Sequence, residues 1–289
     1  MTAISHSSAD TRVPALSVLV EELDIAPRMS ALCAGFEERE WRAEHLAASL
    51  MDWLPNFALS YSERQRFNDL TGRRMMLKAA QKVYKTPKYS HRGEFGELLL
   101  HAVVSELFNT EPAISKLFYK DSANDTVKGF DCVHVIAEAE ALELWLGEVK
   151  FYDDLDRAIR DVVKELHDHA GRDYLRSEFL AITDKIDPAW PHGDRLKRLL
   201  DPNISLDEVF TRLRVPVLLT YDSQTVAAHT SWEDPYRDRF RDEVLTGYRK
   251  FSEKELPENL AIHLLLVPLK SKKVLVKILD EKLRVWQNL

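Results

Sequence analysis

The spacing of apolar residues predicts helices in the first third of the chain. Segment 36–54 is rich in Ala, Glu, Leu and Trp, and we expect its helix to end at Pro55 because proline breaks helix interiors. Ser62 is a suitable N-cap for a second helix over residues 63–84. A third helix is expected from about residue 92 to residue 108. The N-terminal region is therefore expected to be helical.

Beyond this point the pattern changes to alternating and short apolar runs, which are typical of strands. Segments 130–137 and 142–152 predict two neighbouring strands joined by a turn, and segment 155–169 predicts the helix that follows them. The remaining apolar runs are interpreted as buried strands at 179–183, 215–221 and 260–269, with a final helix at 272–286.

This order of elements predicts an α/β fold, in which a mixed sheet flanked by helices follows an N-terminal helical extension. We divide the chain into a helical region, 1–88, either separate or packed on the rest, and a domain, 89–289. The composition, 45% hydrophobic and 30% charged over 289 residues, allows a sizeable core. The chain has no apolar run of bilayer length and no signal-peptide pattern at its start, so we expect a cytoplasmic protein with no membrane partner.

Charge is distributed unevenly along the sequence. The formal net charge is −7, which argues against strong non-specific binding to nucleic acid. Segment 61–92, however, holds nine basic residues against Glu63 and Asp69, which is +7, so the rest of the chain carries −7 − 7 = −14. This asymmetry predicts either one basic groove on an acidic body or a solvated, lysine-rich helix face.

The triplet Glu148-Val149-Lys150 is the strongest candidate for chemistry. Residues two apart on a strand share a face, so the carboxylate and the ammonium group should point the same way. Asp131 lies seventeen positions earlier on the preceding expected strand, and a hairpin would place it beside Glu148. Phosphodiester cleavage needs such carboxylates to hold Mg²⁺, with a cation nearby to orient the nucleophile or stabilise charge.

Glutamates on the preceding helix extend this group. Glu94 and Glu97 are one turn apart and share a face, with His101 one turn further along. Either glutamate could reach a metal through a water molecule.

A strand-edge salt bridge is the alternative reading of the Glu148 triplet. The pattern alone is weak in a chain with so many charges, and 280–282 (Asp-Glu-Lys) repeats it in the final helix, where we expect a solvated face. Sequence context distinguishes the triplet at 148–150 from the one at 280–282, because Glu148 lies in an apolar strand that follows a strand with an aspartate.

Other polar clusters are interpreted as structural. His167 and His169 do not share a helix face, so we expect a polar helix end rather than a metal site. Cys132 is expected in the core and His134 in a structural or, at most, supporting position. Two cysteines are too few for a disulfide framework or a zinc site of their own.

Three segments resemble the motif series of the PD-(D/E)xK nuclease superfamily and, more narrowly, the HamA family, the nuclease subunits of the Hachiman antiphage defence system. The segments are 92–98 (RGEFGEL), 128–134 (KGFDCVH) and 144–152 (LWLGEVKFY). The resemblance covers residues 90–170 at motif level and is looser elsewhere. Gly129-Phe130 stands where a proline can precede the aspartate, a variation that leaves the chemistry intact.

The resemblance implies a restriction-endonuclease-like fold and an Mg²⁺-dependent DNA nuclease, with Mn²⁺ as a second possible metal. It implies that Asp131 and Glu148 bind the metal with the Val149 carbonyl, and that Lys150 positions or activates the attacking water. It also implies that Glu97 is the acid of the first helix. Glu94 is then the competing choice for that position.

The resemblance further implies a superfamily 2 helicase as partner, which feeds DNA to the nuclease. A net acidic nuclease that grips DNA poorly alone fits that division of labour. Part of residues 1–88 is then hypothesised to bind the helicase or to inhibit the nuclease. The alternatives are a repair or restriction-type nuclease, a non-catalytic helicase-binding module with the same fold, and an α/β scaffold with an accidental motif.

Overall fold

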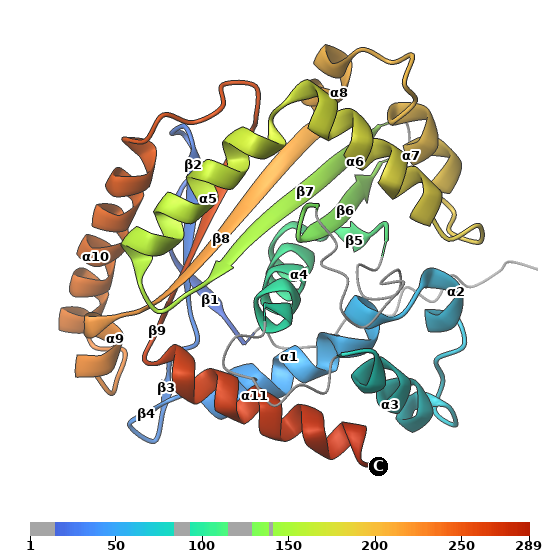
Figure 1. The fold of residues 1–289 in the computed structure, drawn as a ribbon. Helices are drawn as coiled ribbons and strands as arrows, with labels where there is room; N and C mark the ends of the chain where they lie inside the picture. Colours follow the sequence, from blue (N-terminus) through green and yellow to red (C-terminus); the bar gives the residue numbers. More distant parts are fainter. Residues whose placement is uncertain (1–14, 84–92, 115–128, 139–140) are drawn as a thin grey trace, which may run out of the picture.

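A central sheet organises the chain in the computed structural model, which describes residues 15–83, 93–114, 129–138 and 141–289 (Figure 1). Within these residues the sheet has seven strands in the order β1-β2-β9-β8-β7-β6-β5. They are β1 (Ser17–Glu22), β2 (Arg28–Cys33), β5 (Glu111–Pro112), β6 (Cys132–Ala137), β7 (Leu142–Phe151), β8 (Leu213–Asp222) and β9 (Ile262–Leu269). Two short strands, β3 (Phe36–Glu37) and β4 (Glu40–Trp41), pair separately.

The middle of the sheet is parallel. β2, β9, β8 and β7 run in one direction, whereas β1 and β6 run in the opposite direction at the two sides, and β5 pairs antiparallel with β6. Every residue of β9 is buried, as are eight of the ten residues of β8. Strands covered on both faces are continuous apolar runs, which explains why these segments were recognisable in the sequence.

Helices cover both faces of the sheet. They are α1 (Ala43–Ala58), α2 (Tyr61–Arg64), α3 (Gly72–Lys82), α4 (Glu94–Phe108), α5 (Leu155–His169), α6 (Arg172–Lys185), α7 (Gly193–Leu199), α8 (Leu206–Arg212), α9 (Gln224–Ala228), α10 (Asp234–Ser252) and α11 (Lys272–Gln287). α4 packs on one face of β7, and α5 and α10 lie on the opposite face of the sheet. α1 and α11 lie side by side next to α4 (Figure 1).

The predicted α/β fold, with a mixed sheet flanked by helices, is confirmed. The helix predicted over 155–169 coincides with α5, and the one predicted over 272–286 is α11. The strands predicted at 142–152, 215–221 and 260–269 are β7, β8 and β9. None of the helices in the described ranges is both long and apolar enough to cross a membrane.

The expectation of an entirely helical N-terminal region was wrong for residues 17–41. β1 and β2 lie in this segment, and β2 pairs in parallel with β9, more than 230 residues further along the chain. Burial against that distant strand decides the structure of such a short apolar segment, and local spacing cannot reveal it. The proposed division at residue 88 lies outside the described residues and stays a prediction.

Two predicted helices have other boundaries in the structure. α1 continues through Pro55 to Ala58, so the proline lies within the last turn, at the cost of the hydrogen bond that its missing N–H would donate to the carbonyl four residues earlier. The predicted helix at 63–84 is two helices, and the first is capped by Ser60, whose hydroxyl accepts from the Glu63 N–H while the Glu63 carboxylate accepts from the Ser60 N–H.

The strand predicted at 179–183 is wrong, since these residues lie inside α6. Leu175, Phe179 and Ile182 are buried at helical spacing, and Leu180 is exposed. A five-residue apolar run does not distinguish a buried strand from one face of a helix.

Candidate active site

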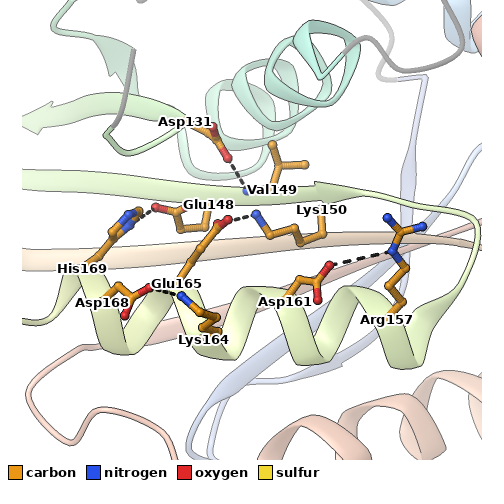
Figure 2. A network of polar contacts seen from close by, with 10 residues as sticks. All are labelled: Asp131, Glu148, Val149, Lys150, Arg157, Asp161, Lys164, Glu165, Asp168 and His169. Carbon is orange, nitrogen blue, oxygen red and sulfur yellow. Dashed lines mark hydrogen bonds and ion pairs between the residues drawn. The ribbon is translucent and has the colours of Figure 1, made fainter. Parts of the chain in front are cut away.

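The pairing of β6 with β7 brings Asp131 beside the Glu148 triplet. Cys132 pairs with Gly147, and the Asp131 N–H donates to the Gly147 carbonyl at 2.8 Å. One carboxylate oxygen of Asp131, Oδ2, accepts from the backbone N–H of Val149 at 2.9 Å (Figure 2). The Asp131 carboxylate is therefore held beside Val149, the middle residue of the triplet.

Glu148 and Lys150 share one face of β7, and this face meets α5 (Figure 2). The Glu148 side chain is 1% exposed, and its Oε1 lies 2.6 Å from Nδ1 of His169. Lys150, also buried, forms an ion pair with Glu165. The spacing of the two charged residues on β7 matches the spacing of their two partners on α5, because two residues of strand advance about 6.8 Å and four residues of helix about 6 Å. The two charges of β7 thus meet Glu165 and His169, which are four residues apart on α5.

Aromatic rings hold the imidazole of His169 in place. It stacks on Tyr174, with ring centroids 4.2 Å apart and planes inclined by 11°, and meets the edge of Phe130 at 5.0 Å. Burial lowers the pKa of His169 below its ordinary value, although the charges of Glu165 and Asp131 act in the opposite direction. Burial thus favours the neutral ring, whose Nδ1 lies within hydrogen-bond distance of the Glu148 carboxylate.

The ammonium group of Lys150 stays charged in this environment. Burial on its own would lower the pKa of Lys150, but the hydrogen bond and charge of Glu165, with the charges of Asp131 and Glu148, outweigh it and raise the pKa. Lys150 is therefore a fixed positive charge surrounded by three carboxylates.

A cavity of about 840 Å³ opens beside these residues. Glu97 from α4 lines it, together with Asp131, Val149, Lys150 and residues of α11. Among the described residues, Glu148, whose side chain is 1% exposed, and Glu94 do not line this cavity. The side chains of Glu97, Asp131 and Lys150 therefore line one cavity. The predicted Glu148 lies on the same face of β7 as Lys150.

The donors available here are oxygen atoms, the class that Mg²⁺ prefers. They are the carboxylates of Glu97, Asp131 and Glu148 and the carbonyl of Val149. No three His, Cys, Asp or Glu side chains within the described ranges are grouped closely enough to hold a metal ion by themselves. A magnesium site needs only one or two protein carboxylates, completed by waters and substrate oxygens, so the residues present fit this metal.

His169 and Glu165 are the residues that interpretation of the sequence missed. His169 was assigned to a polar helix end, and it is the last residue of α5, but the assignment missed that its half-buried ring bonds a predicted catalytic carboxylate. The available signal was an acid and a histidine four residues apart on the helix that directly follows the triplet. His167, by contrast, is exposed, and its Nε2 lies 2.8 Å from the Glu255 carbonyl.

The remaining polar candidates have structural positions. His134 is buried, with Nε2 2.9 Å from Nδ1 of His101 and Nδ1 2.8 Å from the Thr110 hydroxyl. Cys132 is buried against Gly147, as expected for the core. The second acid–x–lysine triplet lies in α11, where Asp280 is buried and its Oδ2 lies 2.6 Å from Nε of Arg284, so the expected solvated face was wrong for this residue.

The described part of the basic segment 61–92 does not line the cavity. Lys78 and Lys82 both form ion pairs with Glu63, at 2.6 and 2.9 Å. Three of its basic residues, Lys85, Lys88 and Arg92, lie outside the described residues. These two lysines of α3 thus share one carboxylate, away from the lining of the cavity.

Two comparisons place this chain among known proteins. The model of the HamA family matches residues 15–283. Anti-bacteriophage protein A of Escherichia coli (strain K12) is 22% identical to it over 290 residues, an alignment that covers 97% of the chain and 52% of that protein. The chain therefore spans about half the length of this curated relative.

Proposed function

This chain belongs to the HamA family, and from that premise we propose that it is a metal-dependent DNA nuclease that acts in antiphage defence. The defence role is supported by the family and by the anti-bacteriophage relative. The nuclease activity is supported by one observation: Glu97, Asp131 and Lys150 line a single cavity, and Glu148 lies on the same face of β7 as Lys150.

In this proposal Asp131, Glu148 and the Val149 carbonyl hold Mg²⁺, and Mn²⁺ can replace it. The metal supplies activated water and offsets charge on the scissile phosphate. The chain contributes the rest. The Val149 N–H orients the Asp131 carboxylate, His169 orients Glu148, and Lys150 places a positive charge where negative charge develops. Glu97 adds a further acid from α4 at the cavity wall.

A superfamily 2 helicase is the proposed partner, and DNA the proposed substrate. The net charge of −7 disfavours tight, unaided binding of DNA by the chain as a whole, so a partner that delivers DNA complements it. A repair or restriction-type nuclease would use the same residues on other DNA structures.

A non-catalytic module is a second candidate that one observation favours. Both charged groups of the triplet are already engaged, Glu148 by His169 and Lys150 by Glu165. An arrangement that serves stability alone would look the same, so cleavage has to be measured directly.

The test is cleavage of linear and circular plasmid DNA in Mg²⁺ and in EDTA, with and without any helicase encoded beside this chain. Wild type is compared with Lys150→Ala and Glu148→Gln, and with Lys164→Ala, which removes an exposed lysine of α5 paired with Asp168. We expect cutting only with metal, a loss of about 100-fold or more in the first two variants, and no change in the third. Persistent cutting by both site variants would refute the nuclease assignment. Lack of cutting by wild type under every condition would favour the non-catalytic module.

A further inference from the structure

One part of the lining of the cavity is cationic. It consists of Arg157 from the first turn of α5 and three lysines from the first half of α11, which are Lys272, Lys273 and Lys277. We call these four residues the cationic wall. Including Lys150, five cations line the cavity against three carboxylates, those of Glu97, Asp131 and Asp153, in a chain whose net charge is −7.

Fold topology explains why residues so far apart in sequence meet here. β7, β8 and β9 are parallel, so their carboxyl ends lie at one edge of the sheet. α5 begins after β7, and α11 begins after β9, at that edge. The backbone N–H of Lys272 donates to Asp222, the last residue of β8, at 2.6 Å. Ligands of open α/β sheets bind at this edge, beyond the carboxyl ends of the strands.

Two cations of the wall are held in place by aromatic rings. The Arg157 guanidinium lies 4.7 Å from the centroid of the Tyr152 ring, and the Lys272 ammonium lies 5.3 and 5.9 Å from the centroids of Phe151 and Tyr152. These rings immediately follow Lys150 on the chain. The wall is therefore positioned by the same strand end that carries the candidate catalytic residues.

The charge of the wall is poorly neutralised by the protein. Within the described ranges neither Lys272 nor Lys273 forms an ion pair. Lys277 reaches Glu281, and Arg157 reaches Asp161, only at 3.8 Å each. Lys282, on another face of the same helix, pairs closely with Glu44 at 2.9 Å. Burial lowers the pKa of Lys272, and the nearby Arg157 adds to that effect against Asp153 and Asp222. A bound anion would relieve this crowding of cations.

We propose that the cationic wall binds the phosphodiester backbone of DNA beside the bond that is cut. The lysines act as point charges toward phosphate, and contacts to phosphate oxygens carry no sequence information, so binding of the backbone here is independent of sequence. The position of the wall relative to a cleaved bond rests on the proposed nuclease function, whereas the binding of the backbone does not.

The experiment measures binding in EDTA, where metal-dependent cleavage is absent, with a fluorescein-labelled 30-base-pair DNA duplex and the full chain. Fluorescence anisotropy gives the association constant from 25 to 200 mM KCl for wild type, Lys273→Ala/Lys277→Ala and the matched control Lys282→Ala. Each lost phosphate contact should lower the slope of log K against log salt by about 1. We therefore expect the double variant to lose about 2 from the slope and to bind ~50-fold more weakly near 0.1 M salt, with Lys282→Ala unchanged.

Each outcome bears on the proposal. An unchanged slope in the double variant, equal losses in the Lys282→Ala control, or no binding by wild type at 25 mM KCl would overturn it. A duplex RNA of the same sequence is measured in parallel, and a slope change with RNA alone would overturn the DNA assignment. Circular dichroism of every variant excludes unfolding as the cause. Lysine-dependent binding without cleavage in Mg²⁺ would support DNA binding by the cationic wall and refute the nuclease function. Cleavage that is lost only in Lys150→Ala, with an unchanged salt slope in the double variant, would support the nuclease function and refute DNA binding by the cationic wall.

Discussion

Among single side chains, Glu148 has the most demanding environment of the candidate site. Its carboxylate is almost fully buried, and an ionised carboxylate away from water is costly unless it is hydrogen-bonded. His169 supplies a hydrogen bond, and its ring is fixed by stacking on Tyr174. Stability and chemistry are therefore linked in this contact, because the same bond satisfies the buried charge and orients it.

Replacing His169 by alanine should destabilise the protein by about 1–3 kcal/mol, since a hydrogen bond to a buried charged group is lost. Urea unfolding monitored by tryptophan fluorescence measures this change. His167→Ala is the matched control, two residues away on the same helix and exposed, and should change stability by less than about 0.5 kcal/mol. Equal midpoints for the two variants would show that His169 does not support Glu148.

Between secondary-structure elements, the close contact of α4 with β7 places Glu97 at the cavity. A Cβ added to Gly96 would lie 2.6 Å from the Cβ of Phe151 and 3.4 Å from a methyl carbon of Val149. The helix reaches this distance from the strand only because residue 96 has no side chain. Phe151 Cβ is fixed by the backbone of β7 and has little freedom to move away.

Gly96→Ala should therefore destabilise the protein by about 1–2 kcal/mol, because overpacking outweighs the gain of up to ~1 kcal/mol in helix propensity. The displaced helix should also weaken cleavage by moving Glu97 at the cavity wall. Gly93→Ala is the control, since a Cβ there meets nothing within 4 Å. Thermal unfolding and the plasmid assay measure both effects, and a Gly96→Ala variant as stable as Gly93→Ala would contradict the argument.

Across the entire chain, buried histidines connect segments that are distant in sequence. His263 of β9 lies with Nε2 2.9 Å from the Ser30 hydroxyl of β2. Burial, followed by the charge of Arg28, lowers the pKa of His263 to about 4. Burial, followed by the charge of Arg64, lowers the pKa of His134 to about 3. Both rings are therefore neutral in the folded protein at neutral pH.

The sign of the pH dependence follows from these shifts. A histidine whose folded pKa lies below its unfolded value of about 6.5 favours folding fully above pH 6.5, and this contribution is lost as the pH falls towards the folded pKa. We expect the free energy of unfolding to decrease between pH 6.5 and about 4, by up to ~3 kcal/mol from His263 alone. His263→Gln should flatten the profile obtained from urea unfolding at each pH, and His167→Gln should not. Parallel profiles for all three proteins would contradict the assignment.

Local pattern in the sequence was enough to determine the elements that carry the site. β7, α5, β8, β9 and α11 were all predictable, because each is long, strongly periodic or continuously apolar. The approach of Asp131 to Glu148 and Lys150 was also predictable, since consecutive antiparallel strands pair through a short connection. The α/β class followed from the order of these elements, and membership of the HamA family agrees with the resemblance seen in the motifs.

The tertiary structure alone decided which of these elements meet. It added β2 to the sheet beside β9, placed Glu165 and His169 against the charges of β7, and brought the lysines of α11 to a cavity more than 100 residues away in sequence. It also made residues 179–183 helical. Apolar spacing records which face of an element is buried but not what it is buried against. That choice depends on long-range packing, which is why the contacts of Glu165, His169 and the lysines of α11 could not be read from the sequence.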